Sequence, residues 1–338
     1  NLPQNSYSVD LSDCVYYECG NYQNYTVKNG DLLIAMSGAT TGKTAIYRYD
    51  YPSYLNQRVG LFAPKELVHN QFLYPIVESK TFISQLGSKL VAGAQPNISS
   101  QDIETIAVGL PSKEEQIKIA HLFELLNQKI ETQSKIIEEL TTLRSALTEK
   151  SSRQAGTLFS LADILEETDE RSTVVNQYQV LSSTVKGIFS QKEYFNKDIA
   201  SEDNKGYKVV RRGNVVLSPQ NLWMGNINYN NRFDVGIVSP SYKIYSIKKG
   251  FNPTFIAALL KTKKALYEYM LASEQGASVV RRNLNVEAFM GITFRIPNTY
   301  QQEVLSKAIA AIDLKLSNEL AIFEQLQLQK GSLLENMF

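Results

Sequence analysis

The segment SGATTGKT at residues 37–44 has the composition of a phosphate-binding loop, in which glycines and a lysine surround the phosphates of a nucleotide. Such a loop requires four residues between its two glycines, but Gly38 and Gly42 enclose only three. The following residues, TAIYRYDY, are typical of a strand, whereas a phosphate site needs the N-terminus of a helix there. The pattern therefore favours another use for this loop, with a P-loop-like nucleotide-binding enzyme as an alternative.

The histidines, cysteines and carboxylates of the sequence give little support for metal binding or for acid–base catalysis. The two histidines, His69 and His121, stand in helix-like surroundings without cysteines or a carboxylate cluster at ligand spacing. Cys14 and Cys19 are separated by four residues and have no further ligand nearby, so they do not form a zinc motif. We therefore expect no catalytic site, no metal site and no cofactor bound by this chain.

The segment PQNLWMGN at residues 219–226 carries side chains that suit the recognition of DNA bases. The amides of Gln220 and Asn221 can each pair with two atoms of adenine, and Trp223 offers a flat apolar surface. Because bases are distinguished by side chains at the groove edges, this composition predicts a base-reading loop.

Positive charge gathers around this second loop. Residues 205–295 contain 14 Lys and Arg against 4 Asp and Glu, although the whole chain has a net charge of only +1. Such a block suits a surface that faces a polyanion, because neutralised phosphates supply most of the affinity for DNA. Residues 1–112 contain 7 basic and 9 acidic residues, so the first part of the chain lacks this signature.

The elements that must position these loops occur twice. KNGDLLIAMSG (28–38) resembles RRGNVVLSPQN (211–221) with an offset of 183, and residues 95–120 resemble residues 281–306 with an offset of 186. Both copies have a strand, a loop, helix-like stretches, an asparagine turn, a strand that ends in proline and a long helix. We interpret this order as a tandem duplication. The segments 37–44 and 219–226 occupy the same place in their copies, so we expect both loops to face DNA, with Lys43 reaching a phosphate or a guanine.

Each copy ends in a long amphipathic stretch without Gly or Pro over most of its length. After Pro111 and after Pro297, apolar residues recur mainly in steps of three and four, as in a coiled coil. One alternative is that each helix packs only on its own globular part. A stripe of this length favours pairing of the two helices, antiparallel, which predicts an α+β fold with pseudo-twofold symmetry: two mixed α/β domains separated by two long coiled-coil helices.

These segments together resemble the specificity (S) subunit of type I restriction–modification enzymes. The matching stretches in the first copy are GDLLIAMSGATTGKTAIY (30–47), LNQRVGLFAP (55–64), AQPNISSQDI (94–103) and LPSKEEQIKIA (110–120). Those in the second copy are RRGNVVLSP (211–219), RRNLN (281–285) and IPNTYQQEVL (296–305). The resemblance covers nearly the whole chain, and it depends on the order and duplication of the motifs.

The resemblance implies a division of labour along the chain. Residues 1–112 and 152–299 would be two target recognition domains, each reading one half of a bipartite DNA site, and residues 113–150 and 300–338 would be spacer helices. Only residues 1–29 precede Gly30, whereas residues 152–212 precede Gly213, so we expect the first domain to lack its opening part. The second alternative is a coiled-coil scaffold that does not read DNA.

The resemblance also implies partners. These are double-stranded DNA, two methylation subunits that use S-adenosylmethionine, and restriction subunits that use ATP and Mg and attach through the methylation subunits. The chain itself would be cytoplasmic, without a membrane partner, and would serve DNA methylation and defence against phage. The candidate DNA-contacting residues are Ser37, Thr40, Thr41, Lys43, Arg58, Gln95, Arg211, Arg212, Gln220, Asn221, Trp223, Asn226, Lys263, Arg281 and Arg282.

Overall fold

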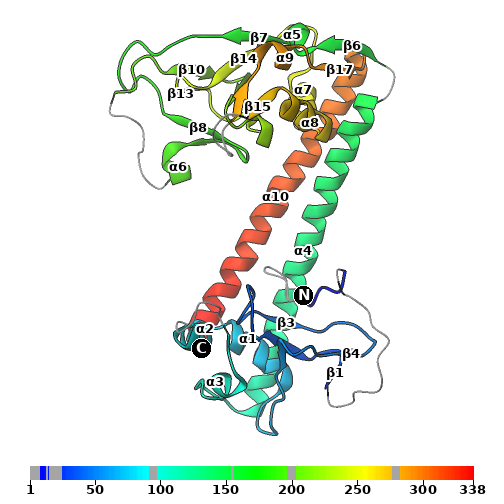
Figure 1. Ribbon diagram of the computed structural model, residues 1–338, viewed down its shortest axis with the longest axis vertical. Coiled ribbons are helices and arrows are strands. Elements are labelled where there is room, and N and C mark those ends of the chain that lie inside the picture. Colours follow the sequence, from blue (N-terminus) through cyan, green and yellow to red (C-terminus); the bar gives the residue numbers. More distant parts are fainter. Residues whose placement is uncertain are drawn as a thin grey trace. The chain divides into compact units, whose positions relative to one another are not determined.

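The computed structural model describes residues 8–12, 14, 25–90, 97–153, 156–195, 203–275 and 282–338. The chain divides into two compact units (Figure 1). Unit 1 comprises Asn1–Glu138 together with Asn318–Phe338, and unit 2 comprises Glu139–Ser317. Two long helices, α4 (Lys113–Arg153) and α10 (Thr299–Met337), each contribute one part to either unit.

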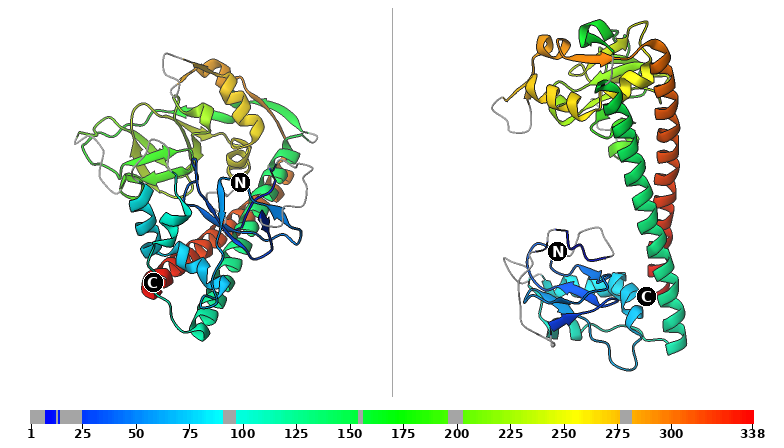
Figure 2. Two further views of the ribbon diagram at one scale, coloured as in Figure 1. Left: turned by 60° about the horizontal axis from the view of Figure 1, so that its bottom comes forward. Right: turned by 90° about the vertical axis from the view of Figure 1, so that its right-hand side faces the viewer.

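Unit 1 is built on a three-stranded antiparallel sheet in the order β3-β2-β5. Its strands are β1 (Thr26–Val27), β2 (Leu32–Ala35), β3 (Thr44–Ile46), β4 (Ser53–Tyr54) and β5 (Val59–Leu61), and its short helices are η2 (Asn70–Phe72), α1 (Leu73–Glu78), α2 (Lys80–Leu90) and α3 (Ser100–Glu104). Figure 2 shows this unit from two further sides, with the strands in blue and the short helices in cyan.

The sequence LLIA makes β2 the centre of unit 1, because its side chains alternate between two apolar clusters. Leu32 and Ile34 pack with Phe72 and Phe82 from the helical side. Leu33 and Ala35 point to the opposite face, against a smaller cluster that contains Tyr47. Both faces of the strand are therefore covered, which explains why it is apolar throughout rather than alternating.

Unit 2 contains a four-stranded antiparallel sheet in the order β12-β11-β14-β7 and four two-stranded pairs, β10-β13, β8-β9, β15-β16 and β17-β6. Its strands are β6 (Thr157–Ser160), β7 (Leu165–Thr168), β8 (Leu181–Thr184), β9 (Gly187–Ser190), β10 (Lys208–Arg211), β11 (Asn214–Leu217), β12 (Ile227–Tyr229), β13 (Val235–Val238), β14 (Lys243–Ile247), β15 (Ser273–Gln275), β16 (Arg282–Leu284) and β17 (Thr293–Ile296). Its helices are α5 (Leu161–Ile164), α6 (Gln191–Phe195), η3 (Leu222–Met224), α7 (Pro253–Leu259), α8 (Lys263–Leu271) and α9 (Val286–Met290).

The two copies of the sequence repeat also have the same strand pairing and register. Leu32 pairs with Ile46 in unit 1, and Val215 pairs with Tyr229 in unit 2, so both partners move by 183 residues. The pairing of β2 with β5 and that of β11 with β14 keep the same offset. Because a slip of one residue would exchange the two faces of a strand, this agreement shows that β3-β2-β5 and β12-β11-β14 are equivalent three-stranded arrangements, to which unit 2 adds β7.

Segments of α4 and α10 pair within each unit (Figure 1). In unit 1, Gln133 donates to the backbone carbonyl of Glu319 at 2.9 Å and also to its carboxylate, and both side chains are buried. In unit 2, Arg144 of α4 forms an ion pair with Asp313 of α10. Within unit 1, Phe123 meets Phe338 and Gln133 meets Glu319, so a higher number on α4 meets a lower number on the C-terminal segment, and the pair is antiparallel, as predicted. In the part of the chain that the structure describes, no helix combines the length and the apolar character needed to cross a bilayer.

The last residue of the chain belongs to the core of unit 1. The Phe338 ring lies 5.8 Å from that of Phe72 and 6.2 Å from that of Phe123, and its backbone carbonyl accepts from the Thr81 hydroxyl at 2.9 Å. The end of α10 therefore completes a domain whose strands come from the first copy.

Replacing Phe338 with alanine is expected to lower the free energy of unfolding of unit 1 by about 1–3 kcal/mol, less than for a fully buried ring, because Phe338 is only half-buried. The only tryptophan, Trp223, lies in unit 2. We therefore expect the far-UV circular dichroism transition of unit 1 to shift in urea, while the transition followed by tryptophan fluorescence stays in place. A shift of the fluorescence transition alone would contradict this assignment.

Candidate nucleic-acid interface

The glycine-rich segment of unit 1 closes a β-hairpin. It connects β2 to β3, which pair antiparallel, so a strand and not a helix follows the loop. Gly38 and Gly42 have φ angles of +92° and +83°, a region that glycine adopts at little cost, and the Gly42 N–H donates to the Ala35 carbonyl at 2.8 Å. A phosphate-binding loop needs the N–H groups of a following helix, and this geometry therefore contradicts the nucleotide-binding alternative.

The corresponding segment of unit 2 also connects two antiparallel strands, β11 and β12, and it contains the 3-10 helix η3. Gly225 has a φ angle of +87° and stands 183 residues after Gly42. Leu222 fixes the middle of this segment, because its side chain is fully buried in the main core of unit 2. Lys261 donates to the Gly225 carbonyl at 2.9 Å, and burial lowers the pKa of this amine to about 8. The loop is thus anchored by one apolar and one polar contact.

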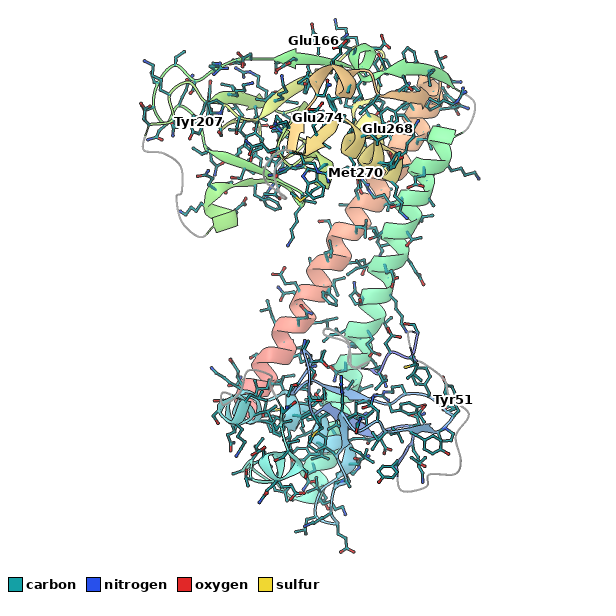
Figure 3. All side chains as sticks on the ribbon, in the orientation of Figure 1. Tyr51, Glu166, Tyr207, Glu268, Met270 and Glu274 are labelled. Atoms are coloured by element: carbon teal, nitrogen blue, oxygen red, sulfur yellow. The ribbon has the colours of Figure 1, made fainter. Side chains whose placement is uncertain are left out.

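Three of the predicted DNA-contacting residues meet at this loop. The guanidinium carbon of Arg282 lies 4.4 Å from the centre of the Trp223 ring, and the backbone N–H of Arg282 donates to the Gln220 backbone carbonyl at 3.2 Å. The Gln220 side chain is exposed, and the Trp223 side chain is partly so. Asn221 is the residue before η3, also partly exposed. Glu274 on β15, the partner strand of β16, and Met270 on α8 locate this part of unit 2 in Figure 3.

Asn226 is not available at this surface, which corrects its assignment as a DNA contact. Its side chain is 4% exposed; its Oδ1 accepts from the Ser183 hydroxyl at 2.9 Å, and its Nδ2 donates to the Ser183 carbonyl at 2.9 Å. Asn228 and Asn230 are buried as well. The alternating asparagines of NINYN share one face of a strand, a period-two signal that indicates a structural role.

Arg211 and Arg212 are tied to carboxylates of their own domain. Arg211 makes two bonds to Glu170, at 2.8 and 2.7 Å, and this pairing lowers the pKa of the Glu170 carboxyl. Arg212 contacts Asp234 at 2.9 Å and two backbone carbonyls. A phosphate contact by either arginine would have to replace these partners. The local excess of basic residues in the sequence is therefore larger than the number of cationic side chains that this surface can direct to phosphates.

The remaining predicted residues are placed as follows. Ser37 forms an isolated antiparallel bridge with Asn97, and Thr40, Thr41 and Lys43 lie in the hairpin segment between β2 and β3. Arg58 is exposed directly before β5, and Lys263 is exposed at the first position of α8. Gln95 and Arg281 lie outside the described residues. In the described ranges, no group of three or more His, Cys, Asp and Glu side chains is arranged to hold a metal ion.

Comparison with known proteins gives a consistent result. Residues 5–142 match the family model of the type I restriction modification DNA specificity domain. The specificity subunit of the type I restriction enzyme MjaVIII from Methanocaldococcus jannaschii is 32% identical over 124 residues, which is 35% of this chain and 29% of that protein. The chain therefore matches less than a third of the length of this relative.

A solved structure extends the similarity to almost the whole chain. The S subunit of a type I restriction–modification system from M. genitalium aligns with 93% of this chain and 84% of its own, at a TM-score of 0.60 and 14% identity. At this identity the similarity concerns the fold, and it includes both copies of the duplicated unit. Residues 5–142 thus match the type I restriction modification DNA specificity domain, and the chain shares its fold with a solved S subunit of a type I restriction–modification system.

Proposed function

We propose that this chain is the non-catalytic specificity subunit of a type I restriction–modification complex and that it reads a bipartite DNA site. The observation that carries the proposal is the repeated hairpin: each copy presents one loop at the same strand junction, with the same register and a left-handed glycine at the same position. One base-reading loop in each copy suits a DNA target that consists of two separate half-sites. Sequence information is then read by these loops, while cations around them bind the phosphates.

The assignment of domains follows the same logic. Residues 1–112 and 152–299 would be the two target recognition domains, with 113–150 and 300–338 as spacer helices. Residues 318–338 of the second helix also complete the core of unit 1, as the contacts of Phe338 show.

The partners follow from this role. Two methylation subunits would supply S-adenosylmethionine chemistry, and restriction subunits attached through them would supply ATP- and Mg-dependent cleavage, all in the cytoplasm. Of the residues that are exposed or partly exposed, Lys43, Arg58 and Lys263 are suited to phosphates, and Gln220, Asn221 and Arg282 to bases.

Methylome sequencing of a host that carries this gene with its methylation partner tests the proposal. We expect one methylated motif made of two short specific halves separated by a gap of fixed length. A complex that assembles but yields no such motif would instead support the scaffold alternative, in which the helices bring partners together without reading DNA.

A further inference from the structure

The Arg282 side chain differs from the other arginines around it. Its guanidinium is stacked on Trp223, and its Nε is buried without a hydrogen-bond partner among the described residues. The residue as a whole is only partly buried, so the exposed part of the side chain lies away from Nε. The other arginines of unit 2 that form ion pairs are Arg144 with Asp313, Arg171 with Asp169, Arg211 with Glu170, Arg212 with Asp234 and Arg232 with Glu193. Within the described part of the chain, the Arg282 guanidinium donates to no carboxylate or carbonyl.

The position of Arg282 is fixed from two sides. Its backbone N–H donates to the Gln220 backbone carbonyl, which ties β16 to the hairpin loop, and β16 itself pairs with β15. Trp223 follows Leu222, whose buried side chain holds the loop in the core. The stacked pair therefore connects two segments that are both anchored, and ordering it on binding costs little side-chain entropy.

We propose that Arg282, oriented by Trp223, reads a guanine in the half-site of unit 2. A guanidinium is planar, and its two terminal nitrogens match the O6 and N7 acceptors at the major-groove edge of guanine. Stacking on the indole fixes the plane of this fork while leaving its donors for a ligand. The amides of Gln220 and Asn221 beside it suit adenine, so the loop would combine both purine contacts. This inference rests on the proposed function, and it names one base class that the second half-site contains.

A guanine contact accounts for the geometry better than a phosphate contact. A phosphate accepts hydrogen bonds from many directions, so a cation that binds it needs no platform. The exposed lysines of this unit, such as Lys263, can bind a phosphate without an aromatic ring beneath them. A fork with a fixed plane is required where two acceptors in one base must be matched at once.

The test uses the full complex with its methylation subunits and a set of duplexes that carry the methylated motif. In each duplex one guanine is replaced by 7-deazaguanine, which lacks the N7 acceptor. For the wild-type complex we expect affinity to fall about tenfold or more at one guanine in one half-site, as for loss of a specific base contact. For the complex with Arg282→Ala, the natural duplex should bind about tenfold or more weakly, and the same replacement should then have little further effect.

Arg232→Ala is the matched control. Arg232 also lies over an aromatic ring, at 4.9 Å from the centre of Phe233, but it is bound to Glu193 at 2.6 Å. We expect this variant to keep the wild-type response to every 7-deazaguanine. Trp223→Phe keeps a smaller ring under the guanidinium and should weaken the guanine response partially, because the indole is the better cation–π partner.

Three results would overturn the inference while leaving the proposed function intact. One is equal affinity of the wild-type complex for all 7-deazaguanine duplexes. Another is an unchanged guanine response in Arg282→Ala, and the third is an Arg282→Ala variant that binds all sequences uniformly more weakly with a shallower salt dependence, as for a phosphate contact. If the wild-type complex showed no preference for any duplex over random DNA, the proposed function itself would fail.

Discussion

Inserting one helical turn into both α4 and α10 is expected to lengthen the gap between the two DNA half-sites by about two base pairs and to leave both half-sites unchanged. Four residues add about 6 Å to a helix at 1.5 Å per residue, and successive base pairs of DNA are about 3.4 Å apart. The prediction rests on the proposed spacer function. Its effect on recognition is large, because the wild-type site would no longer fit.

The structure indicates where the insertions belong. Between residues 138 and 139, and between residues 317 and 318, they fall at the boundaries of the two units. The contact of Gln133 with Glu319 then stays in register within unit 1, and that of Arg144 with Asp313 within unit 2. An insertion into α4 alone would shift one helix against the other and separate such partners, so it serves as the control and should abolish methylation.

Methylome sequencing distinguishes the outcomes. A motif with the original halves and a longer gap supports the spacer role. Altered half-sites with the original gap would show that residues of the helices take part in base recognition, and the division into readers and spacers would then be wrong.

The duplicated architecture could be predicted from the sequence because it depends on local patterns. Apolar runs, positive-φ glycines and prolines mark strands, turns and helix starts, and these recur at offsets of 183 and 186. The loop SGATTGKT could likewise be separated from a phosphate site by its spacing and by the strand that follows it. The short helices α3 and α9 begin after Ser99 and Asn285, whose side chains accept from the backbone N–H groups of Asp102 and Ala288.

The site could be predicted only in part, because its side chains acquire their roles through distant partners. Composition distinguishes neither the ion-paired Arg211 from Arg282, which makes no ion pair among the described residues, nor the buried Asn226 from the partly exposed Asn221. The stacking of Arg282 on Trp223 joins segments that are far apart along the chain. A sequence pattern shows which side-chain types are present, whereas the tertiary structure determines which of them have no partner within the protein and can contact a ligand.

A buried glutamine in each copy holds the start of the long helix to its domain. Gln116 is 1% exposed; its Oε1 accepts from the backbone N–H of His69 at 2.8 Å, and its Nε2 donates to the Pro111 carbonyl at 3.0 Å. Gln302 is 3% exposed and does the same with the Asn252 N–H at 2.8 Å and the carbonyl of Pro297, the residue equivalent to Pro111, at 2.9 Å. We refer to these two residues as the glutamine clamps.

Replacing Gln302 with leucine is expected to lower the free energy of unfolding of unit 2 by about 2–4 kcal/mol. The leucine fills a similar space but leaves the Asn252 N–H and the Pro297 carbonyl without their partner, at about 1–3 kcal/mol for each buried group. Urea unfolding followed by the fluorescence of Trp223 measures this change in the unit concerned. The neighbouring Gln301 is exposed, so Gln301→Leu provides a control that should stay within about 0.5 kcal/mol of wild type.

Gln302→Glu distinguishes loss of the two hydrogen bonds of Gln302 from a change in side-chain volume, because only the hydrogen bonds make the free energy of unfolding of this variant depend on pH. A neutral carboxyl can still accept from the Asn252 N–H and donate to the Pro297 carbonyl, whereas a carboxylate cannot donate, so the folded domain raises the pKa of the introduced group. The stabilising contribution of the neutral form is then fully present below about pH 4.3, the unfolded value, and is lost as the pH rises through the higher folded pKa. We expect the deficit relative to wild type to be large at pH 8 and to shrink toward pH 5, while Gln301→Glu shows no such trend. A deficit that stayed constant from pH 5 to pH 8 would mean that the two hydrogen bonds of Gln302 do not hold α10 to its domain.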